Sequence, residues 1–309
     1  MKPRFFFFQQ QPTTSLFRTT EAMYGFTPDH AKKSLMSFAI YYGLPMLLLV
    51  NDEGLHVKAT IRQTLGHLRA FLVYLIATGL YQSFFGWISF FPAFDQERPL
   101  GFYSWTSATN LLIWKDTLMV AMLFQMYLTT FGEGLRFLSN LVTGYQTQPL
   151  MLNPLMTANS PTDFWGRKWN LLVHQCLKNG VYKPVRFRMG GSAIVAVIAS
   201  FTASALFHEW ILPMVFIEQK NAYPLGTTSI FFLWQAALIA IEWGTSLGRV
   251  FWKDYMQRLP PLLRSIIVVA TGVPAGHWMV DLYLHSDFFL HGHIGLIAVR
   301  RISDPSSAD

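Results

Sequence analysis

Long apolar stretches separated by polar segments dominate the pattern along this chain. A helix that crosses a lipid bilayer needs about 20 mostly apolar residues. Six stretches reach or approach that length: 34–50, 69–92, 111–131, 192–216, 229–247 and 265–283. The first is short and is interrupted by Gly43 and Pro45. The pattern predicts an all-α fold, a polytopic transmembrane bundle of about six to eight helices with interfacial amphipathic helices.

Neither an internal repeat nor a low-complexity linker divides the apolar part of the sequence, so we expect one membrane domain over residues 34–299. Residues 1–33 are expected to form an N-terminal interfacial or flexible segment, and residues 300–309 a C-terminal tail.

The composition supports a membrane protein and argues against other classes. Of 309 residues, 52% are hydrophobic and only 13% are charged, whereas soluble domains carry about 25% charged residues. We attribute the formal charge of +7 to Lys and Arg residues on cytosolic loops, where they meet lipid headgroups. No nucleic-acid partner is expected. The single cysteine, Cys176, excludes an internal disulfide framework and a CxxC-type metal site.

The distribution of basic residues orients the predicted helices. Residues 132–191 hold seven Lys and Arg against two acidic residues, and residues 248–264 hold four against one. Two predicted spans separate these segments, so both fall on one side, which the positive-inside rule makes the cytosol. Counting six spans backwards then places residues 1–33 on the lumenal side despite their five Lys and Arg. Either one early span does not cross the membrane or the N-terminus is atypical.

The stretch TDFWGRKWNLLVH, residues 162–174, has the features of a helix start. Ser160 can cap it, Pro161 suits the first helical position, and an acidic residue follows at Asp163. Trp165 and Trp169 are four residues apart and share a face, while Arg167 and Lys168 point elsewhere. From the helical pattern alone this is a membrane-surface helix, with aromatic rings at the headgroup boundary and cations facing water and phosphate.

The predicted span at 192–216 holds His208 and Glu209 side by side. An ionisable residue inside a bilayer costs several kcal/mol unless it is paired or faces a cavity, so His208 is a functional candidate. A structural histidine bonded to another helix is the alternative. Small residues at 200 and 202–205 would let neighbouring helices approach closely or leave a lined cavity.

Together, the run DFWGRKWN, the element VYKPVR and the helix ending SALFHE resemble the wax synthase branch of the membrane-bound O-acyltransferase superfamily, as found in plants and algae. The resemblance is clearest over about residues 150–215 and continues more weakly to GVPAGHWMVDLYL, giving a wax synthase-like core at 150–284. It implies a multi-pass enzyme of the endoplasmic reticulum membrane. Such an enzyme transfers the acyl group of acyl-CoA, as co-substrate, to the hydroxyl of a long-chain alcohol and needs no cofactor.

By position in these motifs, the resemblance implies that His208 and Asn170 are catalytic. A neutral histidine suits the removal of a proton from an alcohol. Asn170 could donate to the thioester carbonyl or the tetrahedral oxyanion, or it could orient His208. The other candidates are substrate-binding residues: Trp165, Arg167 and Trp169 around an acyl-CoA portal, Arg186 near the CoA phosphates, and Glu209. Glu209 points about 100° around the helix from His208, so it could instead anchor a neighbouring helix.

Three alternatives remain open at this point. Within the superfamily the acceptor could be a sterol or diacylglycerol, and a polytopic transporter would also hold buried charged residues. Glu242, His277 and Asp281 could line the same cavity as His208 or make structural bonds between helices. No metal site is expected, because His285, His291 and His293 lack the HxxxH and HxxHH spacing of a di-iron centre. The oligomeric state is left open.

Overall fold

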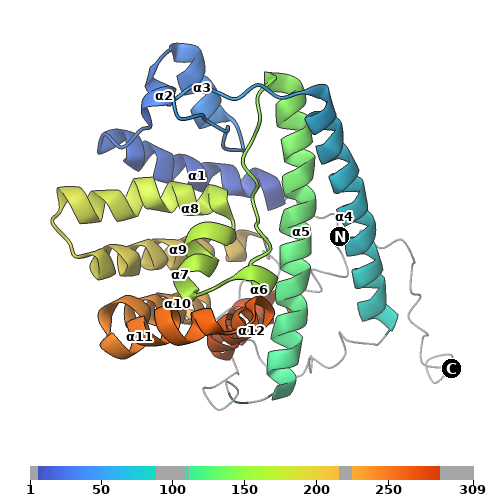
Figure 1. The fold of residues 1–309 in the computed structure, drawn as a ribbon, viewed down its shortest axis with the longest axis vertical. Helices are drawn as coiled ribbons and strands as arrows, with labels where there is room; N and C mark the ends of the chain where they lie inside the picture. Colours follow the sequence, from blue (N-terminus) through green and yellow to red (C-terminus); the bar gives the residue numbers. More distant parts are fainter. Residues whose placement is uncertain (1–5, 88–108, 110, 216–224, 286–309) are drawn as a thin grey trace.

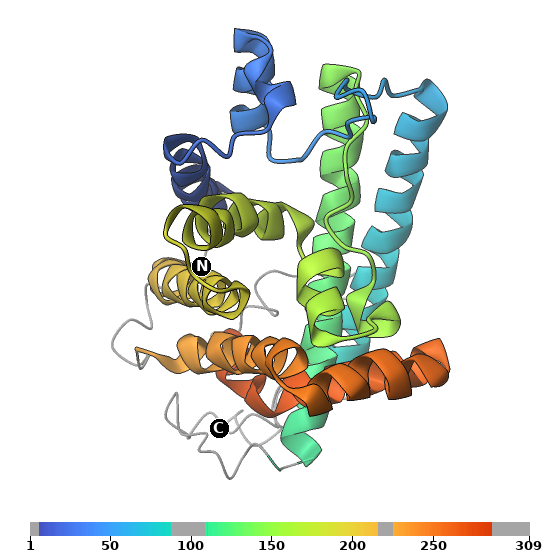
Figure 2. The same ribbon diagram turned by 60° about the vertical axis from the view of Figure 1, so that its left-hand side comes forward.

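Two long helices form one side of the molecule. The computed structural model describes residues 6–87, 109, 111–215 and 225–285. Helices α4 (Ile61–Trp87) and α5 (Leu111–Thr143) run side by side along its long axis (Figures 1 and 2). The Thr78 and Thr130 hydroxyls are 3.0 Å apart across this pair. Hydroxyl pairs of this kind are typical of helix contacts within membranes.

The remaining long helices cross this pair. Helices α1 (Phe6–Met23), α8 (Leu171–Leu177), α9 (Ala193–Val215) and α10 (Thr227–Gly244) are stacked beside α5 and lie across its axis (Figures 1 and 2). A buried cluster joins α5, α9 and α13 (His277–His285), and it includes Leu123, Leu212 and Tyr283. This cluster fixes the end of α9 that carries His208.

Shorter helical segments complete the described chain. The α-helices are α2 (Asp29–Lys32), α3 (Leu35–Gly43), α6 (Pro154–Thr157), α7 (Pro161–Asp163), α11 (Ser246–Val250) and α12 (Pro261–Gly272). The π-helical turns are η3 (Phe164–Lys168), η4 (Lys178–Tyr182), η5 (Pro184–Arg188) and η7 (Phe251–Tyr255), and the 3₁₀ turns are η8 (Met256–Arg258) and η9 (Val273–Ala275). Isolated antiparallel bridges pair Leu48 with Thr147, Val50 with His56, and Lys58 with Tyr145.

Three of the described helices are long and apolar enough to cross a membrane: Ile61–Phe84, Ile113–Thr143 and Ala193–Leu212. Thr227–Gly244 and Ser246–Arg258 would form a fourth span, bent by 86°. Large apolar side chains line the outside of α4, where Leu65, Leu72, Val73, Ile76 and Leu80 are all exposed. Such a continuous apolar surface needs lipid around it. The chain is an all-α, multi-pass membrane protein.

Two of the six predicted spans are not formed. The stretch 34–50 is the nine-residue helix α3 followed by an extended segment, because the helix ends at Gly43 and Pro45 follows. The stretch 265–283 is divided between α12 and α13 by the turn η9, which contains Pro274. Proline lacks the N–H that would continue a helix.

Removing the span at 34–50 resolves the conflict over the N-terminus. Residues 6–33 then fall on the same side as residues 144–192, together with Arg18, Lys32 and Lys33. Direct contacts agree with this count. Arg188 donates from Nη2 to the Tyr24 carbonyl at 3.2 Å, and a Cβ added at Gly180 would lie 2.3 Å from the Phe17 carbonyl oxygen. The boundaries of the predicted segments remain predictions.

Candidate active site

The helix predicted to begin at Ser160 is present, but it is short. The Ser160 hydroxyl accepts the Asp163 N–H at 3.2 Å, and Pro161 takes the first helical position. After three residues the helix widens into η3, where the Trp169 N–H donates to the Phe164 carbonyl at 2.9 Å, five residues back. The prediction of a regular helix across this stretch is therefore wrong. A π-helical turn carries Phe164 and Trp165 instead.

The two cations of this stretch behave differently. Arg167 is exposed, with its Nη1 4.0 Å from the Asp163 carboxylate. Lys168, expected to face water, folds back instead: its Nζ lies 2.8 Å from Asp163 Oδ2, and its side chain is only 16% exposed. Lys168 also donates to the Thr157 carbonyl. Lys168 thus holds the turn closed, and only Arg167 is free to meet a headgroup or substrate phosphate.

Trp165 packs between helices of the protein. Its ring lies 5.9 Å from Phe201 on α9 and 6.0 Å from Phe231 on α10. Its Nε1 donates to Gln235 Oε1 at 3.2 Å. Trp169 lies 5.7 Å from Trp165, which confirms their shared face. Trp165 thus contacts both α9 and α10, and the expectation that these aromatic rings lie at the headgroup boundary stays a prediction.

Asn170 occupies an uncommon backbone conformation. Its φ of 39° lies in the left-handed region, which asparagine enters more readily than most residues. Its Oδ1 accepts the Val173 N–H at 3.3 Å, so Asn170 is the N-cap of α8. Because the oxygen is used in this way, the amide nitrogen is the edge that remains to donate to another group.

The backbone around Asn170 is held from a second side. The Leu152 N–H donates to the Lys168 carbonyl and the Leu171 N–H donates to the Leu150 carbonyl, each at 2.9 Å. These bonds lie on either side of Asn170 and fix it against the segment 150–152. The position of Asn170 therefore depends on both this segment and the π-turn before it.

His208 lies on α9 with one ring nitrogen occupied. Its Nδ1 is 2.7 Å from the Ser204 carbonyl oxygen. A carbonyl oxygen can only accept, so Nδ1 carries the proton and Nε2 carries the lone pair. The ring packs 4.4 Å from Phe232 and 5.0 Å from Phe207. This tautomer leaves Nε2 as the basic nitrogen.

The structure brings Trp165, Trp169 and the Asn170 backbone together, and it links them to His208 through α10. Phe231 touches Trp165, Phe232 touches His208, and the two phenylalanine rings are 5.1 Å apart. The hydrogen bonds of Asn170 and His208 go to different partners. The catalytic roles of both residues stay predictions.

Glu209 caps the N-terminus of α10. Its Oε2 accepts the Gly226 N–H at 3.0 Å, and its Oε1 accepts the Thr228 hydroxyl at 2.6 Å and the Ser229 N–H at 2.9 Å. Helix N-termini leave N–H groups without partners and favour a carboxylate. The anchoring role is confirmed, and a role for Glu209 in binding substrate stays a prediction.

We expect Glu209→Ala to destabilise the protein by about 2 kcal/mol, because several donors at the start of α10 lose a charged acceptor. The thermal midpoint of the purified protein in detergent measures this. Glu209→Gln keeps one acceptor oxygen and should lose less. An alanine variant as stable as the wild type would contradict the cap.

The basic residues near 186 contact the N-terminal region and their own segment. Arg186 is exposed and donates from Nη1 to the Gly191 carbonyl at 2.9 Å. Lys183 and Arg188 both lie over the Phe26 ring, at 5.8 Å and 5.5 Å. Lys183 and Arg188 thus contact the N-terminal region, whereas the hydrogen bond of Arg186 stays within its own segment. Its part in binding CoA phosphates stays a prediction.

Two side chains of α10 are hydrogen-bonded to the candidate site, and the sequence pattern pointed to only one of them. Glu242 Oε2 accepts both the N–H and the hydroxyl of Thr162, at 2.9 Å and 2.8 Å. Gln235, which the sequence reasoning missed, accepts from Trp165 and donates from Nε2 to the Gly272 carbonyl at 3.2 Å. A lone glutamine within an apolar span was the available signal.

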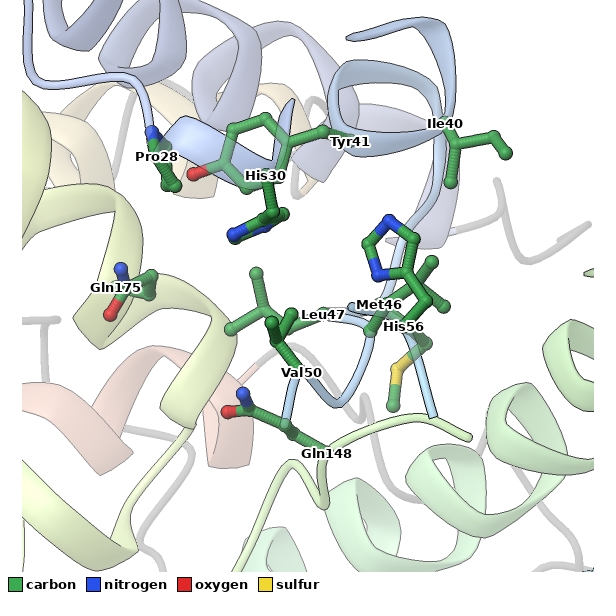
Figure 3. A pocket seen from close by; sticks show the side chains of 11 residues that line it. Pro28, His30, Ile40, Tyr41, Met46, Leu47, Val50, His56, Gln148 and Gln175 are labelled. Atoms are coloured by element: carbon green, nitrogen blue, oxygen red, sulfur yellow. The ribbon is translucent and has the colours of Figure 1, made fainter. Parts of the chain in front are cut away.

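A cavity of about 170 Å³ lies where the N-terminal region meets α8 (Figure 3). The His30 and His56 rings are 5.5 Å apart at this cavity, and burial lowers the pKa of both. Gln175, five residues after Asn170, lines it from α8, and Gln148 lines it from the segment before the motif. The N-terminal third, which shares no recognised motif, thus completes a cavity beside α8.

Stability should depend on pH through His174 of α8. Burial, reinforced by the Lys178 charge, lowers the pKa of His174 from 6.5 to about 4. The fold therefore favours the neutral ring. This stabilisation is complete above pH 6.5 and is lost as the pH falls from 6.5 to about 4, by about 3 kcal/mol. Thermal midpoints across this range should fall more steeply for the wild type than for His174→Gln. Equal slopes would contradict the assignment.

Within the described ranges, no group of three or more His, Cys, Asp or Glu side chains could hold a metal ion. His291 and His293 lie outside the described residues. Cys176 is buried and unbonded to another cysteine.

Comparison with known proteins supports the motifs. Residues 148–234 match the membrane bound O-acyl transferase family. Among similar proteins are two from Arabidopsis thaliana. The probable long-chain-alcohol O-fatty-acyltransferase 7 is 34% identical over 130 residues, which cover 40% of this chain and 36% of that protein. The probable long-chain-alcohol O-fatty-acyltransferase 6 is 28% identical over 229 residues, which cover 63% and 64%.

A third relative is the long-chain-alcohol O-fatty-acyltransferase of Simmondsia chinensis, 32% identical over 105 residues, or 32% of this chain and 28% of that protein. The chain thus spans between about a quarter and two thirds of the length of these relatives. No solved structure matches the chain. The matches confirm the resemblance to the wax synthase branch.

Proposed function

We propose that this chain, whose residues 148–234 match the membrane bound O-acyl transferase family, is a member of that family and transfers a fatty acyl group from acyl-CoA to the hydroxyl of a long-chain alcohol. The product is a wax ester, and free CoA is released. The names of the similar proteins support this activity. The observation that carries it is the His208 tautomer, with Nε2 left basic by the bond from Nδ1 to Ser204.

The proposed reaction uses two groups of this chain. His208 Nε2 takes the alcohol proton while the alcohol oxygen attacks the thioester carbonyl carbon. Asn170 donates an amide N–H to the oxyanion that forms, a contribution worth about 3 kcal/mol in other enzymes. The tetrahedral intermediate then expels the CoA thiolate, which takes the proton from the imidazolium. The products are an ester and the CoA thiol, so protons and charge balance.

The bonds around each residue favour the oxyanion role of Asn170 over the orienting role. His208 is already oriented by its own helix through Ser204. Asn170 uses its oxygen to cap α8, which directs its N–H₂ group as a donor. Arg167, Trp165 and Trp169 are proposed to border the donor's path, with Arg186 contacting phosphate groups. We further propose that the protein resides in the endoplasmic reticulum membrane.

The test is expression in a host that lacks neutral-lipid synthesis, fed separately with fatty alcohol, sterol or diacylglycerol. Microsomes from these cells receive labelled acyl-CoA, and the lipid classes are separated. A labelled wax ester with fatty alcohol is the expected result. Labelled sterol ester or triacylglycerol would instead show that the acceptor is a sterol or diacylglycerol. Lipid movement without any ester would favour a transporter.

A further inference from the structure

The motif turn that carries Asn170 is fastened to α10 at two points. At its beginning, Glu242 Oε2 accepts two bonds from Thr162, one from the backbone N–H at 2.9 Å and one from the hydroxyl at 2.8 Å. Three residues later, Gln235 accepts from the Trp165 indole at 3.2 Å. Glu242 lies seven positions after Gln235, so both side chains lie on one face of α10, about two turns apart.

The same helix is fixed relative to His208. Glu209, the neighbour of His208, caps the start of α10, and Phe232 of α10 packs against the His208 ring at 4.4 Å. Thus α10 contacts the candidate base near its start and the motif turn at several positions from Phe231 to Glu242. Its length of 18 residues makes it the rigid element that both candidate catalytic groups share.

Contacts within the turn connect Thr162 to Asn170. Phe164 stacks on Trp169 at 5.5 Å, and the Trp169 N–H is bonded to the Phe164 carbonyl. The Lys168–Asp163 ion pair closes the turn across its other side. A shift at Thr162 would therefore move Trp169 and the backbone of Asn170 with it.

We propose that Glu242 is a positioning residue for acyl transfer: by holding Thr162, it sets the place of Asn170 relative to His208. This inference rests on the proposed function. Small displacements of a catalytic group lower the rate of the chemical step more than they lower substrate binding. Loss of Glu242 should therefore act on kcat and leave the KM for acyl-CoA nearly unchanged.

Four variants in microsomes test the contact. Glu242→Ala is expected to lower kcat by about 10- to 100-fold. Glu242→Gln keeps an acceptor oxygen and should retain kcat within about threefold. Thr162→Ser keeps both donors and should match the wild type, whereas Thr162→Val loses the hydroxyl and should fall between. The control, Ile241→Ala, removes an exposed neighbour on the same helix.

A double-mutant cycle separates positioning from simple stabilisation. In the Asn170→Ala background, Glu242→Ala should lower kcat by less than about threefold, because the group it positions is already gone. A fully additive loss would overturn the proposal. A Glu242→Ala enzyme with the wild-type kcat, once the rate is divided by the amount of folded protein, would also overturn it.

Hydrogen exchange gives a reading that does not need activity. Glu242→Ala should speed exchange in peptides that cover residues 160–170 at least about tenfold, because the Thr162 N–H loses its acceptor, while peptides from α4 stay unchanged. Unaltered exchange in 160–170 would contradict the hydrogen bonds between Glu242 and Thr162 on which the proposal rests. A wild type that forms no ester with any acceptor would overturn the proposed function. An additive double-mutant cycle in an active enzyme would overturn only the positioning role of Glu242 and leave the proposed function standing.

Discussion

Replacing His208 with alanine is expected to lower ester formation by at least about 10³-fold, because general base catalysis typically contributes 10²–10⁴. The substitution removes the basic Nε2, and the alcohol then has no group to take its proton at the moment of attack. The measurement is the rate of labelled ester formation from acyl-CoA and fatty alcohol, divided by the amount of protein in the membrane.

The variant should still insert and accumulate, because the His208 ring is hydrogen-bonded to Ser204 within its own helix. Leu206→Ala is the matched control. It removes a side chain that is 64% exposed on the same helix, and it should keep wild-type activity. An active His208→Ala enzyme would end the assignment of the base, and an inactive Leu206→Ala enzyme would show that α9 tolerates no substitution.

The sequence predicted those parts of the fold that depend on long local patterns. Helices α4, α5 and α9 follow from uninterrupted apolar stretches. The stretch 34–50 is also apolar, yet its side chains serve a different purpose: Met46 and Leu48 are buried inside the protein, at 2% and 9% exposure. Hydropathy records that a side chain avoids water, and it does not distinguish lipid from a protein core.

The candidate site was predictable to the same extent. The cap at Ser160 and the shared face of Trp165 and Trp169 are local features, and both are confirmed. The π-turn and the left-handed Asn170 are not, since they depend on bonds to residues 150–152 and to α10. Glu242 illustrates the limit: its position in an apolar span marks it as unusual, but its partner, Thr162, lies 80 residues away.

Asn170→Asp should lower the rate of ester formation by about 10²–10³-fold, the cost of removing one oxyanion donor. Aspartate is as good an N-cap as asparagine and also tolerates the left-handed conformation. The variant therefore keeps the bond from the Val173 N–H that orients this position. It loses only the N–H₂ group and places a negative charge where the oxyanion would form.

Asn170→Gly and Asn170→Ala complete the test. Glycine keeps the backbone conformation without a side chain, so it should lose the donor and part of the cap, and alanine should add strain at a φ of 39°. If the amide acts on the oxyanion, all three variants lose kcat, and aspartate is the most stable of them to heat. If aspartate instead retains near wild-type kcat, capping of α8 is the whole role of Asn170, and another group must stabilise the tetrahedral intermediate.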